Sequence, residues 1–229
     1  MEFTYDMMLE KLRKKEPFQY SRWGDGEWQC VLGYEGQNCD GHRYFPSLRM
    51  ALIEVLRDNP KYYMGMQPKA YRTMDMAIDP WCDVNEVNID WCNADILHDA
   101  SIAGRLDEFL KLLSTGRVFM VSHDRICSAI NNEVARRFMS DLWICFDIPL
   151  NNCWNIHEGL LHELSEYIGM QRPPVILYCA SMMSKVLIHK INQMFGDTIT
   201  QIDCGSVFDP YAGYATRRYH QAIIEREKK

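Results

Sequence analysis

The sequence contains no apolar run of about 18 residues, the length that a membrane-spanning helix requires. Its first residues, up to Pro17, also lack the apolar core of a secretory signal peptide. None of the nine cysteines forms a C-x-x-C pair, and several lie inside apolar runs. We therefore expect reduced, mostly buried thiols, no zinc site, no membrane span and a cytoplasmic protein.

Positive charge is also scarce. The chain has 25 Lys and Arg against 31 Asp and Glu, a formal net charge of -6. Proteins that grip duplex DNA broadly are usually basic, so this balance argues against general nucleic-acid affinity while leaving room for a local basic groove. The 229 residues, 47% of them hydrophobic, suffice for one globular domain with a core of its own.

Two nucleotide-binding motifs are absent as well. No G-x-G-x-x-G follows an expected strand, and no G-x-x-x-x-G-K-[ST] occurs. These absences argue against a dinucleotide-dependent dehydrogenase and against a P-loop NTPase.

Expected strands and helices alternate along the chain. We expect strands over residues 18–23, 61–66, 117–122, 142–149, 174–181 and 198–205. We expect helices over residues 4–15, 48–58, 101–116, 126–139, 158–169, 184–196 and 213–229. This order predicts a Rossmann-like α/β fold, a mostly parallel sheet of about six strands with helices on both faces. We expect a single domain over 1–229, with an irregular insertion around 67–98 that is rich in Trp, Asp and Asn.

In such sheets, ligands bind at the carboxyl ends of the strands. There "GDGE", residues 24–27, follows the first expected strand. If this segment is extended, Asp25 and Glu27 point to the same side, and Gly26 between them allows a ligand to approach. Two carboxylates form a hard oxygen site suited to Mg²⁺ or Mn²⁺, which bind through carboxylates and substrate phosphates. The alternative is a turn with solvated acids; the glycines, including Gly24, and the nearby Arg22 favour a site.

Several segments resemble one known family. "FQYSRWGDGEW" resembles the signature of the GT-D glycosyltransferases, which have a Rossmann-like domain and a D-x-E motif. "ILYCASMMSKVLIHKI" and "TITQIDCGSVFDPYAG" are similar to the late strand, helix and strand of that family. "ASIAGRLDEFL" resembles its middle segment, with Arg105 at the matching Arg. The resemblance spans nearly the whole chain and is weakest between residues 60 and 100.

The resemblance implies that a hexose is transferred from a UDP-sugar to an acceptor hydroxyl with the help of a divalent metal. The acceptor would be a glycan, a protein-linked glycan or another biopolymer. In the family, the D-x-E carboxylates serve the metal and the diphosphate, which carries these roles over to Asp25 and Glu27. Arg22 would help to stabilise the charge of the leaving diphosphate.

Two further strand ends carry candidate residues. His123 and Asp124 end the strand expected over 117–122, where His123 would bond a phosphate, act as a base, or simply hold a turn. Ser181 stands where a helix begins, which is either an anion site or a helix cap.

The last strand end is our candidate for the acceptor side. Gly205 permits close approach of a ligand to the backbone, and Ser206 and two carboxylates surround it. Asp209 is the preferred base for the incoming hydroxyl, because Asp203 is expected to be held by backbone groups at the strand end.

Three other functions remain open. A DNA glycosyltransferase acting on a hydroxymethylated pyrimidine would use the Arg and Tyr residues of "KAYRTM" (69–74) and "YATRRYHQ" (214–221), against the acidic net charge. The others are a non-catalytic nucleotide-sugar-binding module and a metal-dependent phosphohydrolase. The sequence leaves open the sugar, the acceptor, the stereochemistry and the oligomeric state.

Overall fold

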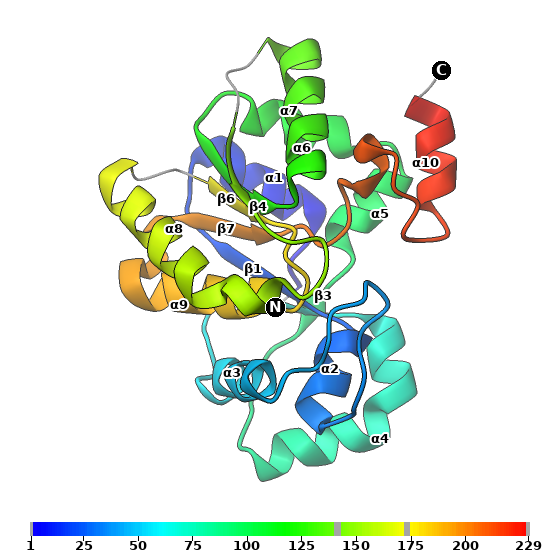
Figure 1. Ribbon diagram of the computed structural model, residues 1–229, viewed down its shortest axis with the longest axis vertical. Helices are drawn as coiled ribbons and strands as arrows, with labels where there is room; N and C mark the ends of the chain where they lie inside the picture. The colour runs from blue at the N-terminus through cyan, green and yellow to red at the C-terminus, as the bar shows by residue number, and fades with distance from the viewer. Residues whose placement is uncertain (1, 140–142, 172–174, 228–229) are drawn as a thin grey trace.

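A computed structural model describes residues 2–139, 143–171 and 175–227. Within them, seven strands form one sheet in the order β3-β2-β1-β7-β6-β4-β5 (Figure 1). The strands are β1 (Gln19–Trp23), β2 (Tyr63–Met66), β3 (Cys92–Asn93), β4 (Val118–Ser122), β5 (Ile144–Asp147), β6 (Val175–Tyr178) and β7 (Thr200–Asp203). Every pairing is parallel, which confirms the Rossmann-like α/β prediction, with seven strands in place of about six.

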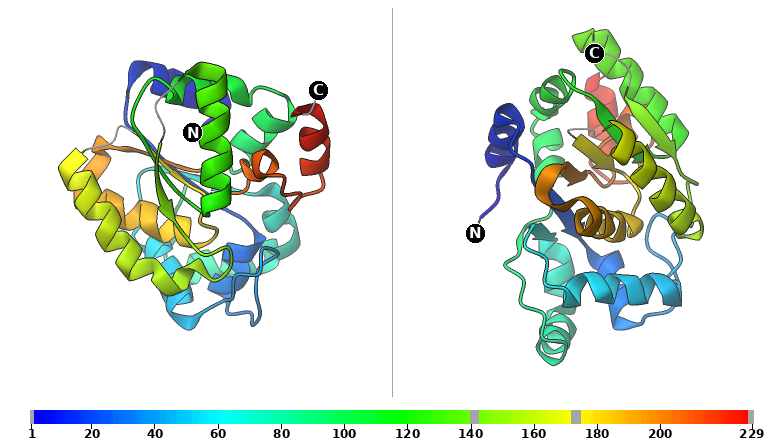
Figure 2. Two further views of the ribbon diagram at one scale, coloured as in Figure 1. Left: turned by 45° about the horizontal axis from the view of Figure 1, so that its top comes forward. Right: turned by 90° about the vertical axis from the view of Figure 1, so that its left-hand side faces the viewer.

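Helices cover both faces of the sheet (Figure 2). The α-helices are α1 (Tyr5–Lys14), α2 (Asp25–Leu32), α3 (Pro46–Arg57), α4 (Pro68–Val84), α5 (Ile96–Ile102), α6 (Leu106–Leu113), α7 (Asp124–Phe138), α8 (His157–Gln171), α9 (Met183–Phe195) and α10 (His220–Glu227). Short 3-10 helices are η1 (Cys153–Ile156), η2 (Gly196–Thr198) and η3 (Asp209–Ala212). Among the described helices, none has the length and the apolar character that crossing a bilayer would need.

The sheet separates two hydrophobic cores, and β6 shows how one strand feeds both. Ile176 and Tyr178 pack into the core that α2, α3, α8 and α9 cover. Val175 and Leu177 pack into the core that α1, α5, α6 and α7 cover. Successive side chains of a strand point to opposite faces, so a wholly apolar strand is expected where both faces are buried.

The expectation of an irregular insertion over 67–98 is wrong. This stretch contains the 17-residue helix α4, the short strand β3 and the start of α5. Pro68 stands in the first turn of α4, where its missing N–H costs nothing. Trp81 packs edge-on against Trp28 of α2, with ring centroids 6.1 Å apart. Tertiary packing therefore makes a helix of a segment whose many Asp, Asn and Trp residues suggest a loop.

The helix expected over 101–116 is also interrupted. Residues 101–102 end α5, and α6 begins only after Gly104, whose φ is +74°. A left-handed glycine of this kind ends one helix and redirects the chain into the next.

The strand order brings two distant segments together. β7 lies beside β1, with Gln19 opposite Gln201 and Tyr20 opposite Ile202. The residues after β1 and those after β7 therefore emerge side by side at the carboxyl edge of the sheet.

Candidate active site

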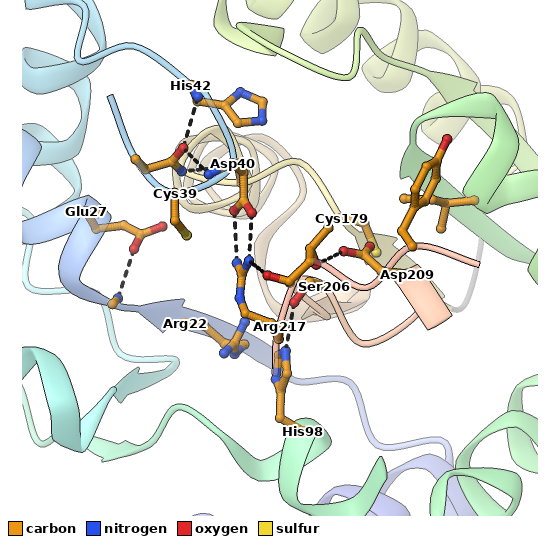
Figure 3. A pocket seen from close by; sticks show the side chains of 18 of the residues that line it. Arg22, Glu27, Cys39, Asp40, His42, His98, Cys179, Ser206, Asp209 and Arg217 are labelled. Atoms are coloured by element: carbon orange, nitrogen blue, oxygen red, sulfur yellow. Dashed lines mark hydrogen bonds and ion pairs between the residues drawn. The ribbon is translucent and has the colours of Figure 1, made fainter. Parts of the chain in front are cut away.

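A cavity of about 560 Å³ opens at the carboxyl edge of the sheet (Figure 3). Each of the seven strands contributes one residue or more to its lining, at or just after the strand. In the order β1 to β7, examples are Arg22, Gln67, Asp95, His123, Ile148, Cys179 and Gly205. The position is the one that parallel α/β sheets favour for ligands, and the volume lies within the usual range for small-molecule sites.

The acids of "GDGE" take different directions, because α2 begins at Asp25. In a helix, side chains two positions apart diverge by about 200°, so the expectation that Asp25 and Glu27 share one side is wrong. Asp25 is half-buried, lines the cavity and accepts a hydrogen bond from the Gly26 N–H at 3.0 Å. Glu27 is 9% exposed and accepts from the Gly24 N–H at 2.9 Å, which caps the helix from within.

Glu27 belongs to a buried ion network centred on Lys185. The Lys185 Nζ lies 2.8 Å from Glu27 Oε1 and 2.9 Å from Asp203 Oδ2, and the side chain is 4% exposed. Asp203 also accepts from the backbone N–H of Arg22 and of Gly205, both at 3.1 Å, as expected for a carboxylate at a strand end. Sequence reasoning missed Lys185, although a lysine in an otherwise apolar helix start is a signal that could have found it.

Two groups of this network, Lys185 and Glu27, are held in their charged forms. Burial alone would lower the pKa of Lys185, but the charges of Asp203 and Glu27 raise it above its ordinary value. Burial would raise the pKa of Glu27, but Lys185 and the Gly24 N–H lower it below its usual range. The charge of Glu27 is therefore already compensated inside the protein.

This arrangement decides which acid suits a metal ion. Among the described residues, no group of three or more His, Cys, Asp or Glu side chains is placed to hold one. Glu27 does not fit as a ligand, because Lys185 and the Gly24 N–H occupy its oxygens. Asp25 does fit a site in which water and ligand oxygens complete the coordination, as is usual for Mg²⁺.

Arg22 lies at the floor of the cavity. Its guanidinium donates to the Ala94 carbonyl and pairs with Asp95 at 3.0 Å, and its side chain is 11% exposed. Gly205, with φ +55°, lies directly against it: a Cβ there would come 1.9 Å from Arg22 Nη1. The Arg22 guanidinium thus makes a close approach to the Gly205 backbone at the edge of the cavity.

A second ion pair, absent from the sequence-based site, stands in the middle of the cavity (Figure 3). Arg217 binds Asp40 through two parallel contacts, of 2.8 and 3.0 Å. Burial would raise the pKa of Asp40, but Arg217 holds it below its ordinary value.

Asp209 lines the cavity from η3 and is 8% exposed. It accepts a hydrogen bond from Thr216 Oγ1 at 2.5 Å, and Thr216 in turn lies 3.2 Å from His220 Nδ1. Burial raises the pKa of Asp209 to about 6, and burial together with the charge of Arg217 lowers that of His220 to about 4. A carboxylate with a raised pKa in a cavity suits a general base.

Ser206 also lines the cavity, with its hydroxyl 3.3 Å from His98 Nε2. His98 is 6% exposed, and burial with the nearby charges of Arg22 and Arg217 keeps its pKa well below the ordinary value. The sequence did not single out His98, a neutral partner that fixes the Ser206 hydroxyl.

The remaining predicted residues divide into two groups. His123 and Ser181 line the cavity; His123 also caps α7 through the Arg125 N–H, and Ser181 accepts from Asn38 Nδ2 at 2.8 Å. Asp124 and Arg105, the other two residues that the sequence singled out, do not line this cavity.

The reason is local in both cases. Asp124 is exposed on the first turn of α7, where its backbone N–H donates to Asp147 at 2.7 Å. Arg105 follows the turn at Gly104 and faces α1, where it pairs with Asp6 at 2.6 Å.

The two segments proposed to grip DNA do not assemble into a described groove. Residues 69–74 lie in α4, and most of their side chains fall outside the part of the chain that the structure describes. In 214–221, Arg217 turns into the cavity and His220 is fully buried.

Solved structures with this architecture exist. A selenomethionine-substituted structure of domain of unknown function 1792 (DUF1792) matches with a TM-score of 0.67 and 14% identity over 94% of this chain and 83% of that chain. A second, described as a highly conserved domain with a distinct glycosyltransferase fold, matches with 0.67 and 15% over the same shares. A third, described as a new glycosyltransferase (DUF1792) from Streptococcus sanguinis, matches with 0.65 and 16% over 90% and 81%. The chain has the DUF1792 fold.

The likeness to DUF1792 lies in the fold, because sequence comparison alone finds no matching protein-family profile and no matching curated protein. The fold shared with DUF1792 provides the architecture around the cavity. The chemistry depends on the side chains of this chain.

Proposed function

We propose that this protein is a glycosyltransferase that moves a hexose from a UDP-sugar to an acceptor hydroxyl with the help of Mg²⁺ or Mn²⁺. The fold shared with DUF1792, some of whose structures are described as glycosyltransferases, supports the reaction class. The resemblance of residues 18–28 to the GT-D signature supports the donor class.

The observation that carries the proposal is the combination of helix ends and acids around one cavity. The N-termini of α2, α7 and α9 all meet the cavity, through Gly26, His123 and Ser181. Helix N-termini attract phosphate groups. Yet six carboxylates line the cavity against three cationic side chains of Lys and Arg. A diphosphate therefore enters most favourably together with a divalent cation.

The side chains divide the work as follows. Asp25 would hold the cation together with the phosphates of the donor, and Glu27 would keep Lys185 in place. The cation, when bound, neutralises the charge that develops on the leaving diphosphate. Asp209 would take the proton of the acceptor hydroxyl, and its raised pKa keeps its affinity for that proton high.

The test is to follow the products formed from several UDP-sugars, with and without acceptor glycans. A glycosyltransferase releases UDP, whereas a phosphohydrolase releases UMP and a sugar phosphate. A binding module turns nothing over. We expect UDP release, and the other two product patterns would each refute the proposal.

The role of Asp25 has its own readout. In Asp25→Ala, or in EDTA, UDP release should fall by about 100-fold or more, since a metal stabilises the transition state by several kcal/mol. Asp99→Ala, which removes another acid from the cavity lining, is the matched control and should have a much smaller effect. Full activity in EDTA, or equal losses in the two variants, would contradict this role.

A further inference from the structure

The pair of Asp40 and Arg217 spans the cavity rather than lining one wall. Asp40 lies on the segment between α2 and α3, and Arg217 lies just before α10, 177 positions away. Figure 3 shows the two side chains meeting in the centre of the pocket, between Glu27 on one side and Asp209 on the other. A ligand that fills the cavity has to meet this pair.

The other two cations of the cavity are committed to the protein. Lys185 is 4% exposed and contacts two carboxylates, Glu27 and Asp203. Arg22 is 11% exposed and is held by Asp95 and by a backbone carbonyl. Arg217 is 30% exposed, and its carboxylate partner, Asp40, is equally exposed. Of the three, Arg217 is the one that can most easily take a new partner.

Replacing Asp40 as the partner of Arg217 costs little free energy. Ion pairs between partly exposed side chains contribute only modestly to stability, because water screens both groups. A diphosphate carries more negative charge than one carboxylate, and a guanidinium binds phosphate oxygens through the same two-pronged geometry.

We propose that Arg217 binds the diphosphate of the ligand by exchanging Asp40 for it, so that Asp40 competes with the ligand for Arg217. The nature of the ligand rests on the proposed function; the exchange itself rests on the geometry of the pair. Asp40 occupies Arg217 in the empty cavity and keeps it oriented, and it releases Arg217 when a group of higher charge arrives.

Substitutions of the two partners of this ion pair should have opposite effects on the affinity for the diphosphate. By calorimetry in the presence of Mg²⁺, with UDP and with inorganic pyrophosphate, Arg217→Gln should bind both ligands about tenfold or more weakly, the loss of one charge-assisted contact. Asp40→Asn, which removes the competitor, should bind both about threefold to tenfold more tightly. Uridine, which has no phosphate, should bind equally to all forms. If the pair is only a structural bridge, both variants lose affinity together, and the proposal is overturned.

A double variant separates exchange from a general effect of charge. If Asp40 acts through Arg217, the gain of Asp40→Asn disappears in Asp40→Asn/Arg217→Gln. A gain that persists in the double variant overturns the proposal. Asp6→Asn, which breaks the exposed pair with Arg105 far from the cavity, is the matched control and should change nothing. Arg217→Lys keeps the positive charge but loses the two-pronged guanidinium. Its affinity for both anions should lie between those of wild type and Arg217→Gln.

The outcomes for the two proposals can be told apart. If wild type turns over a UDP-sugar but Asp40→Asn and Arg217→Gln do not have opposite effects on affinity, the exchange is refuted and the glycosyltransferase proposal stands. If Asp40→Asn and Arg217→Gln have opposite effects on pyrophosphate binding, but wild type binds UDP no more tightly than pyrophosphate, the exchange is confirmed and a nucleotide donor is ruled out. If wild type binds neither UDP nor pyrophosphate, both the exchange and the glycosyltransferase proposal are refuted.

Discussion

Glu27 is a structural residue as well as a member of the candidate site. Glu27→Ala removes one of the two carboxylates around buried Lys185 and the acceptor for the Gly24 N–H. We expect it to lower the free energy of unfolding by about 3 kcal/mol, near the lower end for a broken buried pair because Asp203 still pairs with Lys185.

Urea denaturation of Glu27→Ala beside Asp25→Ala measures this difference. Asp25→Ala should stay within about 0.5 kcal/mol of wild type, since its carboxylate is only half-buried and bonds its own neighbour. Similar stabilities for the two variants would mean that the ion network contributes nothing to folding.

Asp209 links stability and activity through its pKa. Burial raises that pKa from 3.8 to about 6, so between these values the folded protein holds a proton that the unfolded chain has lost. Stability therefore decreases as the pH rises from about 4 to about 6, and the ionised group costs as much as about 3 kcal/mol at pH 7.

Asp209→Asn should accordingly be more stable than wild type at pH 7 and equal to it at pH 4, as thermal melts at both pH values would show. The same variant should lose transfer activity by about 100-fold or more, the usual contribution of a general base, while binding UDP normally. In wild type, activity should fall as the pH drops through about 6, where Asp209 becomes protonated. A variant of unchanged stability and activity would rule out both roles.

At the scale of elements, the turn after β7 determines where Arg22 lies. Gly205→Ala places a Cβ 1.9 Å from Arg22 Nη1, in addition to the cost of φ +55°. Gly213→Ala is the matched control, with φ +78° and nothing within 4 Å of the added Cβ. We expect Gly213→Ala to lose about 1 kcal/mol, the cost of the left-handed conformation, and Gly205→Ala clearly more.

Calorimetric titration with UDP adds a second measurement for the Gly205→Ala and Gly213→Ala variants. Gly205→Ala should weaken UDP binding, because Arg22 is displaced from the floor of the cavity, whereas Gly213→Ala should not. If the two variants were alike in stability and binding, the contact between Gly205 and Arg22 would have no importance.

Elements with a regular apolar period were predictable from the sequence, and elements built by packing were not. The strands expected around Val118–Ser122 and Val175–Tyr178 occur as β4 and β6, because residues buried on both faces form continuous apolar runs. Helix α4 was missed, since its helical state depends on contacts such as Trp28 with Trp81. The two-residue strand β3 is too short to leave a pattern.

At the scale of the whole molecule, the acidic lining predicts that donor and cation stabilise the protein only together. With Mn²⁺ and UDP at 100 times the dissociation constant, binding adds about 2.7 kcal/mol to stability. For a domain of this size, that raises the Tm by roughly 5 to 10 °C. UDP in EDTA should give a much smaller shift, because six carboxylates line the cavity against three cations.

Thermal melts of wild type and Asp25→Asn, with UDP and with or without Mn²⁺, test this prediction. Asp25→Asn should lose the part of the shift that needs the metal. An equal shift in EDTA would show that the diphosphate enters without a cation.

The sequence by itself determined the α/β architecture and the edge of the sheet at which the cavity lies. Alternating strands and helices, apolar runs and strand-end motifs are local patterns, and they placed Asp25, Asp209 and Ser206 at one cavity. Only the tertiary structure decided which charges meet there. Lys185 lies between Glu27 and Asp203 because β7 inserts between β1 and β6, and Arg217 meets Asp40 across 177 positions. A charged side chain has no period that reveals its partner, since that partner is set by the order of the strands and by the turns that follow them.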